Sequence, residues 1–123
     1  MVNTDIALKE VMTIEGSLGA ALVDVNSGLA LGTLGGGKEF DLNAAAAGNT
    51  DVVRAKYRTM EMLGIAGTVE DILITLSGQY HLIRPLGSRS GSGLFLYLVL
   101  DRKRSNLAMA RRQLEQVEGR LEV

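Results

Sequence analysis

One stretch of the chain has the spacing of a phosphate-binding loop. Gly32, Gly37 and Lys38 satisfy the G-x-x-x-x-G-K pattern, and the stretch follows a predicted strand. The next residue, however, is Glu39, where such loops carry a Ser or Thr that holds Mg²⁺, and its carboxylate would repel a β-phosphate. The chain also lacks the alternating strand and helix pattern of a parallel nucleotide-binding sheet. A degenerate nucleotide- or small-ligand-binding domain is therefore an alternative that the sequence disfavours.

The other side chains able to do chemistry are isolated from one another. The chain has one histidine, His81, and no cysteine, which excludes thiolate metal sites and leaves the imidazole without partners. Glu70 and Asp71 are neighbours on a predicted strand, so their carboxylates point to opposite faces and form no acid–base pair. The basic run 102–104 is interpreted as solvated. We therefore expect no catalytic, cofactor-binding or metal-binding residue.

Composition and charge limit the class of protein. A chain of 123 residues is interpreted as a single domain, 1–123, with one core. The formal net charge of −1 and the lack of tryptophan argue against nucleic-acid and anionic-membrane partners. Residues 1–16 lack the apolar core of a signal peptide, and the longest apolar run, Leu94–Leu100, is too short to span a membrane. With no cysteine for disulfides, a cytoplasmic location is expected.

The stretch 17–37 predicts a hairpin. Ala20, Leu22 and Asp24 fall on one face of an extended run, and the residues between them fall on the other. Asn26, Ser27 and Gly28 are expected to supply the positive φ values of a short turn. A serine- and glycine-rich stretch later in the chain, with Ser88, Ser90 and Ser92, is interpreted as a loop, with phosphorylation as the functional alternative.

A second hairpin is predicted from 70–77 and 79–86. A two-residue turn at Ser77 and Gly78 sets the register. It places Ile72 opposite Ile83, Ile74 opposite His81, and Asp71 opposite Arg84 as a cross-strand charge pair. The following run, Leu94–Leu100, is apolar on both faces, which predicts the middle strand of the sheet.

Three helices are expected around these strands. The first spans Thr4–Glu15 with Thr4 or Asn3 as N-cap, the second runs from its cap Asp41 to about Leu63, and the last is capped by Ser105. The order is therefore α-β-β-α-β-β-β-α. Antiparallel hairpins with helices on both faces make this an α+β domain.

The predicted helix 41–63 carries two apolar stripes. The first consists of Leu42, Ala46, Val53, Tyr57 and Met60. The second consists of Ala44, Gly48, Val52, Ala55, Thr59 and Met62. Thr50, Arg54, Arg58 and Glu61 separate them on one side. A domain of this size offers one sheet for one stripe, and the small side chains of the second let two helices approach closely. The second stripe therefore predicts a second copy of the chain as partner.

With this element order, four runs make the chain resemble the roadblock / dynein light chain domain family over nearly its whole length. The runs are Gly19–Asp24, Ser27–Ala30, Leu82–Gly87 and Leu94–Leu100. The most specific parts are a hairpin similar to G-A-x-x-V-D-x-x-G, lengthened here, and a strand ending at Pro85 before a short loop and a leucine-rich strand. The resemblance implies a profilin-like, five-stranded antiparallel sheet with helices on both faces.

The same resemblance implies a homodimer in which the second helices pack together and the third strands pair edge to edge. The expected interface residues are Ala44, Gly48, Val52, Ala55, Thr59, Met62, Ile72, Ile74 and Leu76. Members of the family have no enzymatic site; they regulate Ras-like small GTPases or serve as subunits of motor and signalling assemblies. We therefore expect a non-enzymatic homodimeric module that binds a Ras-like GTPase. A structural adaptor subunit with no GTPase partner is the alternative.

Overall fold

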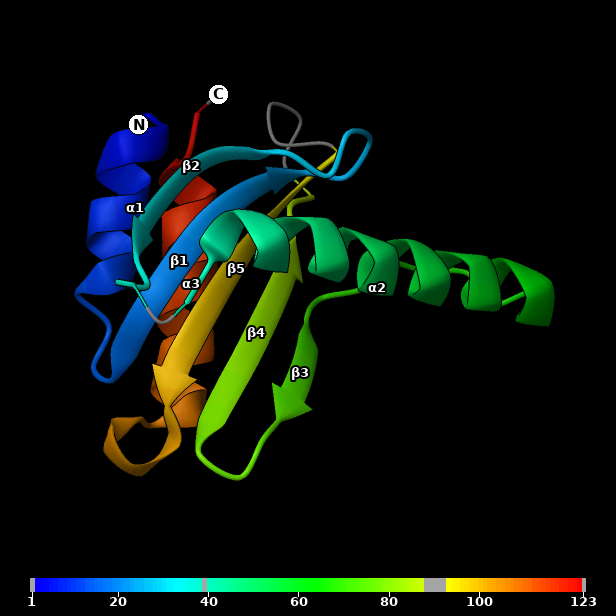
Figure 1. The fold of residues 1–123 in the computed structure, drawn as a ribbon. Helices are drawn as coiled ribbons and strands as arrows, with labels where there is room; N and C mark the ends of the chain where they lie inside the picture. The colour runs from blue at the N-terminus through cyan, green and yellow to red at the C-terminus, as the bar shows by residue number, and fades with distance from the viewer. Residues whose placement is uncertain (1, 39, 88–92, 123) are drawn as a thin grey trace.

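The structure is a computed structural model that describes residues 2–38, 40–87 and 93–122 (Figure 1). Its elements are α1 (Thr4–Met12), β1 (Ser17–Asp24), β2 (Ala30–Gly35), α2 (Leu42–Leu63), β3 (Ile72–Thr75), β4 (Gln79–Pro85), β5 (Leu94–Asp101), a 3₁₀ turn η1 (Arg102–Arg104) and α3 (Leu107–Arg120). The predicted order of helices and strands is confirmed.

The strands form one five-stranded antiparallel sheet in the order β2-β1-β5-β4-β3. β5 is the middle strand, as its two apolar faces predict. The predicted register of the second hairpin is also confirmed, with Ile72 opposite Ile83 and Ile74 opposite His81. β2 and β3 are the two edges of this sheet.

Helices cover both faces of the sheet. α1 and α3 pack on one face, and α2 crosses the other (Figure 1). The alternation of β5 divides its side chains between two cores: Leu96 and Leu98 lie under α1 and α3, whereas Phe95 and Tyr97 lie on the α2 face. Burying a side chain such as Phe95 completely stabilises the fold by about 1.5–3 kcal/mol. The sheet is therefore held from both sides through its middle strand.

Capping residues set the ends of α2 where the sequence predicts them. Asp41 Oδ1 accepts hydrogen bonds from the backbone N–H groups of Asn43 and Ala44, both at 3.0 Å. At the other end Gly64 takes a left-handed conformation with φ of 68°, which costs a glycine little. The bounds of the helix thus follow from local chemistry.

Three local predictions are wrong. α1 ends at Met12, not Glu15, and the cap of α3 is Asn106, because the Ser105 hydroxyl donates instead to the Asp101 carbonyl at 2.6 Å. In the first hairpin turn only Gly28 has a positive φ. The Asp24 carboxylate holds that turn by accepting from the Asn26 N–H, so a left-handed asparagine is unnecessary. Ser88, Ser90 and Ser92, interpreted as part of a loop with phosphorylation as the alternative, lie outside the described residues.

Candidate interaction surface

Only the first half of α2 rests on the sheet. Figure 1 shows the helix crossing β1, β5 and β4 and then continuing past β3, away from the rest of the domain. Its buried residues are Leu42, Ala46, Thr50 and Val53, and none of its residues beyond Val53 is buried. The second half of this helix therefore has no fully buried residue against the described part of its own chain.

The first apolar stripe of α2 is confirmed only in part. Leu42, Ala46 and Val53 are buried against the sheet, but Tyr57 is 39% exposed because the helix has by then passed the edge strand. Thr50 was expected between the stripes and is instead buried with 1% of its surface exposed. Its hydroxyl donates to the Ala46 carbonyl at 2.8 Å, which satisfies its polar group within the helix.

The second stripe of α2 is accessible along its length. Ala44, Gly48, Thr59 and Met62 are exposed, and Val52 and Ala55 are half-buried. The exposed apolar surface continues past the stripe through Leu63 and Ile65, which are 66% and 53% exposed, and Met62 reaches 79%. An apolar surface of this extent at the end of a projecting helix is typical of an interaction site.

A groove lies between this part of α2 and the chain segment that enters β3. Its volume is about 610 Å³. It is lined by Val52, Ala55, Lys56, Thr59, Val69, Asp71 and Ile72. Three second-stripe residues and one β3 residue thus border one cavity, so the structure brings together the helix and strand parts of the predicted interface.

β3 exposes its outer edge beside this groove. Its sole neighbour within the described sheet is β4. The Leu76 N–H donates to the Gln79 carbonyl at the turn, and hydrogen-bonded pairs alternate in an antiparallel ladder, so the backbone of Ile74 faces His81. The outward N–H groups are therefore those of Leu73 and Thr75, not that of Ile74. Leu76 is 42% exposed at the end of the strand.

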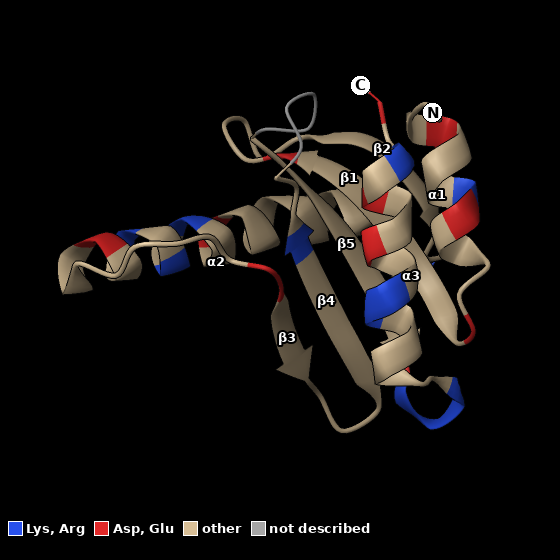
Figure 2. Cartoon of the chain, turned by 180° about the vertical axis from the view of Figure 1, so that it is seen from behind, with Lys and Arg blue, Asp and Glu red and all other residues tan. Residues whose placement is uncertain are grey.

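Ion pairs with α3 hold β3 and β4 from the opposite face. Arg111 binds both carboxylate oxygens of Asp71, at 2.8 and 3.2 Å, and Arg84 binds Glu118 at 2.6 Å. The predicted cross-strand pair of Asp71 with Arg84 is therefore wrong. α3 lies across this face with charges of both signs, so each strand residue pairs with the helix (Figure 2).

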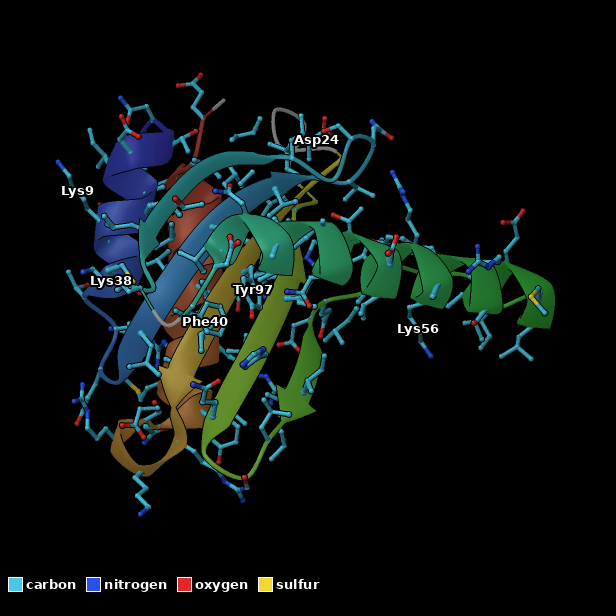
Figure 3. The ribbon with its side chains drawn as sticks, viewed as in Figure 1. Lys9, Asp24, Lys38, Phe40, Lys56 and Tyr97 are labelled. Carbon is cyan, nitrogen blue, oxygen red and sulfur yellow. The ribbon has the colours of Figure 1, made fainter. Side chains whose placement is uncertain are left out.

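His81 lies in a hydrogen-bonded aromatic cluster on the α2 face. Its Nδ1 is 2.9 Å from the Tyr97 hydroxyl and its Nε2 is 2.9 Å from Gln79 Oε1. Because Gln79 Oε1 can only accept, we assign the proton to Nε2, and the Tyr97 hydroxyl then donates to Nδ1. Phe40 packs edge-on at 5.9 Å, and Tyr97 lies beneath α2 (Figure 3). This neutral ring has both nitrogens satisfied, which is a structural role.

Burial shifts the titration of both members of this pair. Desolvation lowers the pKa of His81, because the charged imidazolium loses hydration. Burial raises the pKa of Tyr97, and a hydrogen bond with Asn49 partly opposes that rise. No carboxylate bonds to the imidazole among the described residues, so the cluster has no acid–base partner for catalysis.

The stretch with phosphate-loop spacing is largely a strand. Gly32 and Gly35 belong to β2, and α2 begins only at Leu42, so Lys38 is not at the N-terminus of a helix. Phosphate loops need backbone amides that converge on the ligand, which an extended edge strand does not provide. Glu39 lies outside the described residues.

Residues 2–38, 40–87 and 93–122 offer neither a metal-binding group nor a membrane-spanning helix. Within those ranges no group of three His, Cys, Asp or Glu side chains could hold a metal ion. None of the helices described there is long and apolar enough to cross a membrane.

Comparison with solved structures identifies the fold. A roadblock/LC7 domain from Streptomyces avermitilis matches with a TM-score of 0.80 and 15% identity over 97% of this chain and 94% of that chain. MglB from Myxococcus xanthus matches with 0.79 and 16% over 93% and 87%. The gliding protein MglB from Thermus thermophilus matches with 0.68 and 17% over 94% and 88%. The chain therefore has the roadblock fold.

The sequence itself is distant from characterised proteins. No family model matches it, and no curated protein matches it. The likeness is therefore one of structure.

Proposed function

We propose that the chain forms a homodimer through α2 and β3, and that this dimer is a non-enzymatic cytoplasmic module that binds a Ras-like small GTPase. The observation that carries the proposal is the uncovered apolar half of α2 beside the free edge of β3. A partner that covers both must supply a strand and an apolar helix face together. A second copy of the chain has both.

The proposed dimer has a two-fold axis through the paired outer edges of two β3 strands. The axis joins the sheets and brings the second α2 toward the first, where small side chains allow close packing. The interface residues remain Ala44, Gly48, Val52, Ala55, Thr59, Met62, Ile72, Ile74 and Leu76. Burying Met62 and Leu63 there contributes about 1.5–3 kcal/mol each.

The GTPase part of the proposal rests on the roadblock fold and on the shape that a two-fold axis creates. Joining two sheets produces one broad face that neither chain has alone. A GTPase lying across the axis contacts both copies and blocks the equivalent second position. We therefore expect one GTPase per dimer.

Thr75→Pro tests the dimer. Thr75 is exposed and its N–H faces outward, so proline removes an intermolecular donor without breaking the hairpin. Ile74→Pro is less suitable, because it removes a bond to His81 inside the hairpin. Light scattering of the wild type at low micromolar concentration should give twice the 13.1 kDa chain mass, and the variant should give a single chain mass. A folded Thr75→Pro protein that stays dimeric at that concentration contradicts the β3 interface.

Ras-like GTPases encoded by the same genome, loaded with GDP or a non-hydrolysable GTP analogue, test the second part. Native mass spectrometry should show one GTPase with two copies of this chain, and Thr75→Pro should abolish the complex. Two GTPases per dimer, or full affinity of the monomeric variant, counts against a face that spans the axis. Absence of any complex favours the structural adaptor.

A further inference from the structure

The opposite edge of the sheet is also free. The outer side of β2 pairs with no strand of the described chain, and its sequence, Ala30-Leu31-Gly32-Thr33-Leu34-Gly35, contains neither a charge nor a proline. Leu31 is 54% exposed and Leu34 is 37% exposed. Proteins usually protect exposed edges with charge, proline or a covering element. β2 has instead a bulge at Leu31, and its regular unpaired stretch is Gly32–Leu34.

One backbone hydrogen bond and the strand register determine which groups of β2 face outward. The Gly36 N–H donates to the Leu18 carbonyl at 2.8 Å, and Leu34 and Gly32 lie opposite Ala20 and Leu22 of β1. Antiparallel bonding alternates, so the backbones of Gly32 and Leu34 face β1. The backbone groups of Thr33 and Gly35 therefore point away from the sheet, available to another strand.

The sequence of this edge complements itself. When two β2 strands pair antiparallel about Thr33, each Leu34 lies opposite a Gly32, and the regular pairing ends at the bulge of Leu31 and at Gly35, whose φ is 78°. Each Leu34 then lies opposite a residue that has no side chain and that contacts Leu8 and Thr4 of α1, and the two Thr33 residues form a favourable cross-strand pair. A one-residue slip would place Leu34 opposite Thr33 and lose this fit.

The charges beside the edge complement themselves too. Asp5 and Lys9 of α1 line a groove of about 150 Å³ together with Leu8, Thr33 and Leu34. Lys9 points away from the body of the domain (Figure 3). A two-fold axis at Thr33 runs the two α1 helices in opposite directions, so Asp5 of each copy approaches Lys9 of the other. A partner that carries charges of one sign only would attract either Asp5 or Lys9, but not both.

We propose that β2 is a second self-association edge, at which two copies pair antiparallel about Thr33. This interface lacks a long uncovered helix, so it is weaker than the β3 interface and forms at high concentration. Each interface has its own two-fold axis, and two such axes at opposite edges link dimers into larger assemblies. The β2 interface does not require the β3 interface.

Sedimentation velocity at low micromolar and near-millimolar concentration tests this inference. The wild type should gain mass beyond the dimer at high concentration, whereas Thr33→Pro should remain dimeric throughout. Thr75→Pro should pass from monomer to dimer through β2 alone, and adding Thr33→Pro should remove that step. The comparison of Thr75→Pro with the double variant tests β2 pairing by itself, so its result can be interpreted even if β3 pairing does not occur.

Two further variants protect the test from misfolding. Thr33→Lys leaves the backbone intact and places two like charges opposite each other, so it should also prevent the high-concentration assembly. Asp5→Lys should weaken the assembly by like-charge contact with Lys9, and adding Lys9→Asp should restore it. A wild type that stays dimeric at near-millimolar concentration overturns the proposal, as does unchanged assembly of folded Thr33→Pro and Thr33→Lys.

Discussion

The two edges of the sheet present similar backbone surfaces with different surroundings. β2 and β3 both lack charged residues and proline, and both expose a threonine whose N–H faces outward. β3 has four residues and lies beside the uncovered half of α2, whereas β2 has six and lies beside α1, whose apolar residues Ala7, Leu8 and Val11 are already buried. β2 is therefore the longer edge strand, whereas β3 has the larger uncovered apolar surface beside it.

The magnitudes decide which edge dominates. A backbone hydrogen bond adds a net stability of about 0.5–1.5 kcal/mol, since the same groups bond to water when they are free. Burying one large apolar side chain gives about 1.5–3 kcal/mol, and α2 offers Met62, Leu63 and Ile65. The adjacent helix therefore matters more than the two additional residues of β2. The comparison teaches that an open edge becomes a strong interface through the apolar surface beside it.

The largest expected effect is on the β3 side. Ala55→Glu places a carboxylate in the groove between α2 and β3, where dimerisation would strip its hydration at a cost of several kcal/mol. Light scattering should show monomer or insoluble protein. Arg58→Glu, which replaces a cation with a carboxylate at an exposed position of the same helix and so changes the charge even more, is the control and should remain dimeric. An Ala55→Glu dimer with unchanged melting temperature would remove α2 from the interface.

A smaller effect is expected on the pH dependence of stability, which should involve the β3 side of the sheet and not β2. The chain has one histidine, His81, and it lies beside β3; its pKa is lowered from 6.5 by burial. As the pH falls through about 6.5 the unfolded chain takes up the proton first, so the free energy of unfolding declines until the folded-state pKa is passed. Urea unfolding between about pH 8 and pH 5 should show this slope in the wild type and lose it in His81→Gln.

The same titration should leave β2 pairing unaffected. In Thr75→Pro, where assembly depends on β2 alone, the monomer–dimer equilibrium should be constant over that range as long as the chain is folded. A His81→Gln slope equal to that of the wild type would assign the pH dependence to other groups.

The last prediction concerns the end of β2, where we expect no effect. Lys38→Ala should not alter calorimetric titrations with ATP or GTP, because Gly32–Gly35 of the loop-like stretch belong to a paired strand and α2 begins only at Leu42. Both proteins should give flat titrations. Micromolar nucleotide binding that disappears in the variant would show that this end of β2 is a ligand site and not only an edge for strand pairing.

Local chemistry made much of the fold predictable. Asp41 and Gly64 mark the ends of α2 because a carboxylate satisfies free N–H groups and glycine tolerates a left-handed conformation. The turn at Ser77 and Gly78 determines the register of the second hairpin, since a two-residue loop allows one pairing. The apolar run of β5 indicates a strand covered on both faces. Each of these signals depends on residues close together in the chain.

Two of the failed predictions depend instead on segments that are far apart in the chain. Asp71 and Arg84 are neighbours in a hairpin, yet both pair with α3, which is distant in sequence. Thr50 is polar by type, but the path of α2 over the sheet buries it. How Ala55 approaches Ile72 across a groove was not predicted, because it depends on how the helix crosses the sheet.

The sequence by itself determined the element order, the caps of α2, the register of the second hairpin and the two-striped pattern of α2, because these follow from neighbouring side chains and helical or strand periodicity. Only the tertiary structure decided that α2 leaves the sheet after Val53, that Leu73 and Thr75 carry the outward N–H groups of β3, and that Asp5 and Lys9 flank β2. Those features depend on the angle at which elements cross and on which edge of a ladder is bonded. They are properties of packing between segments far apart in the chain, which no local pattern encodes.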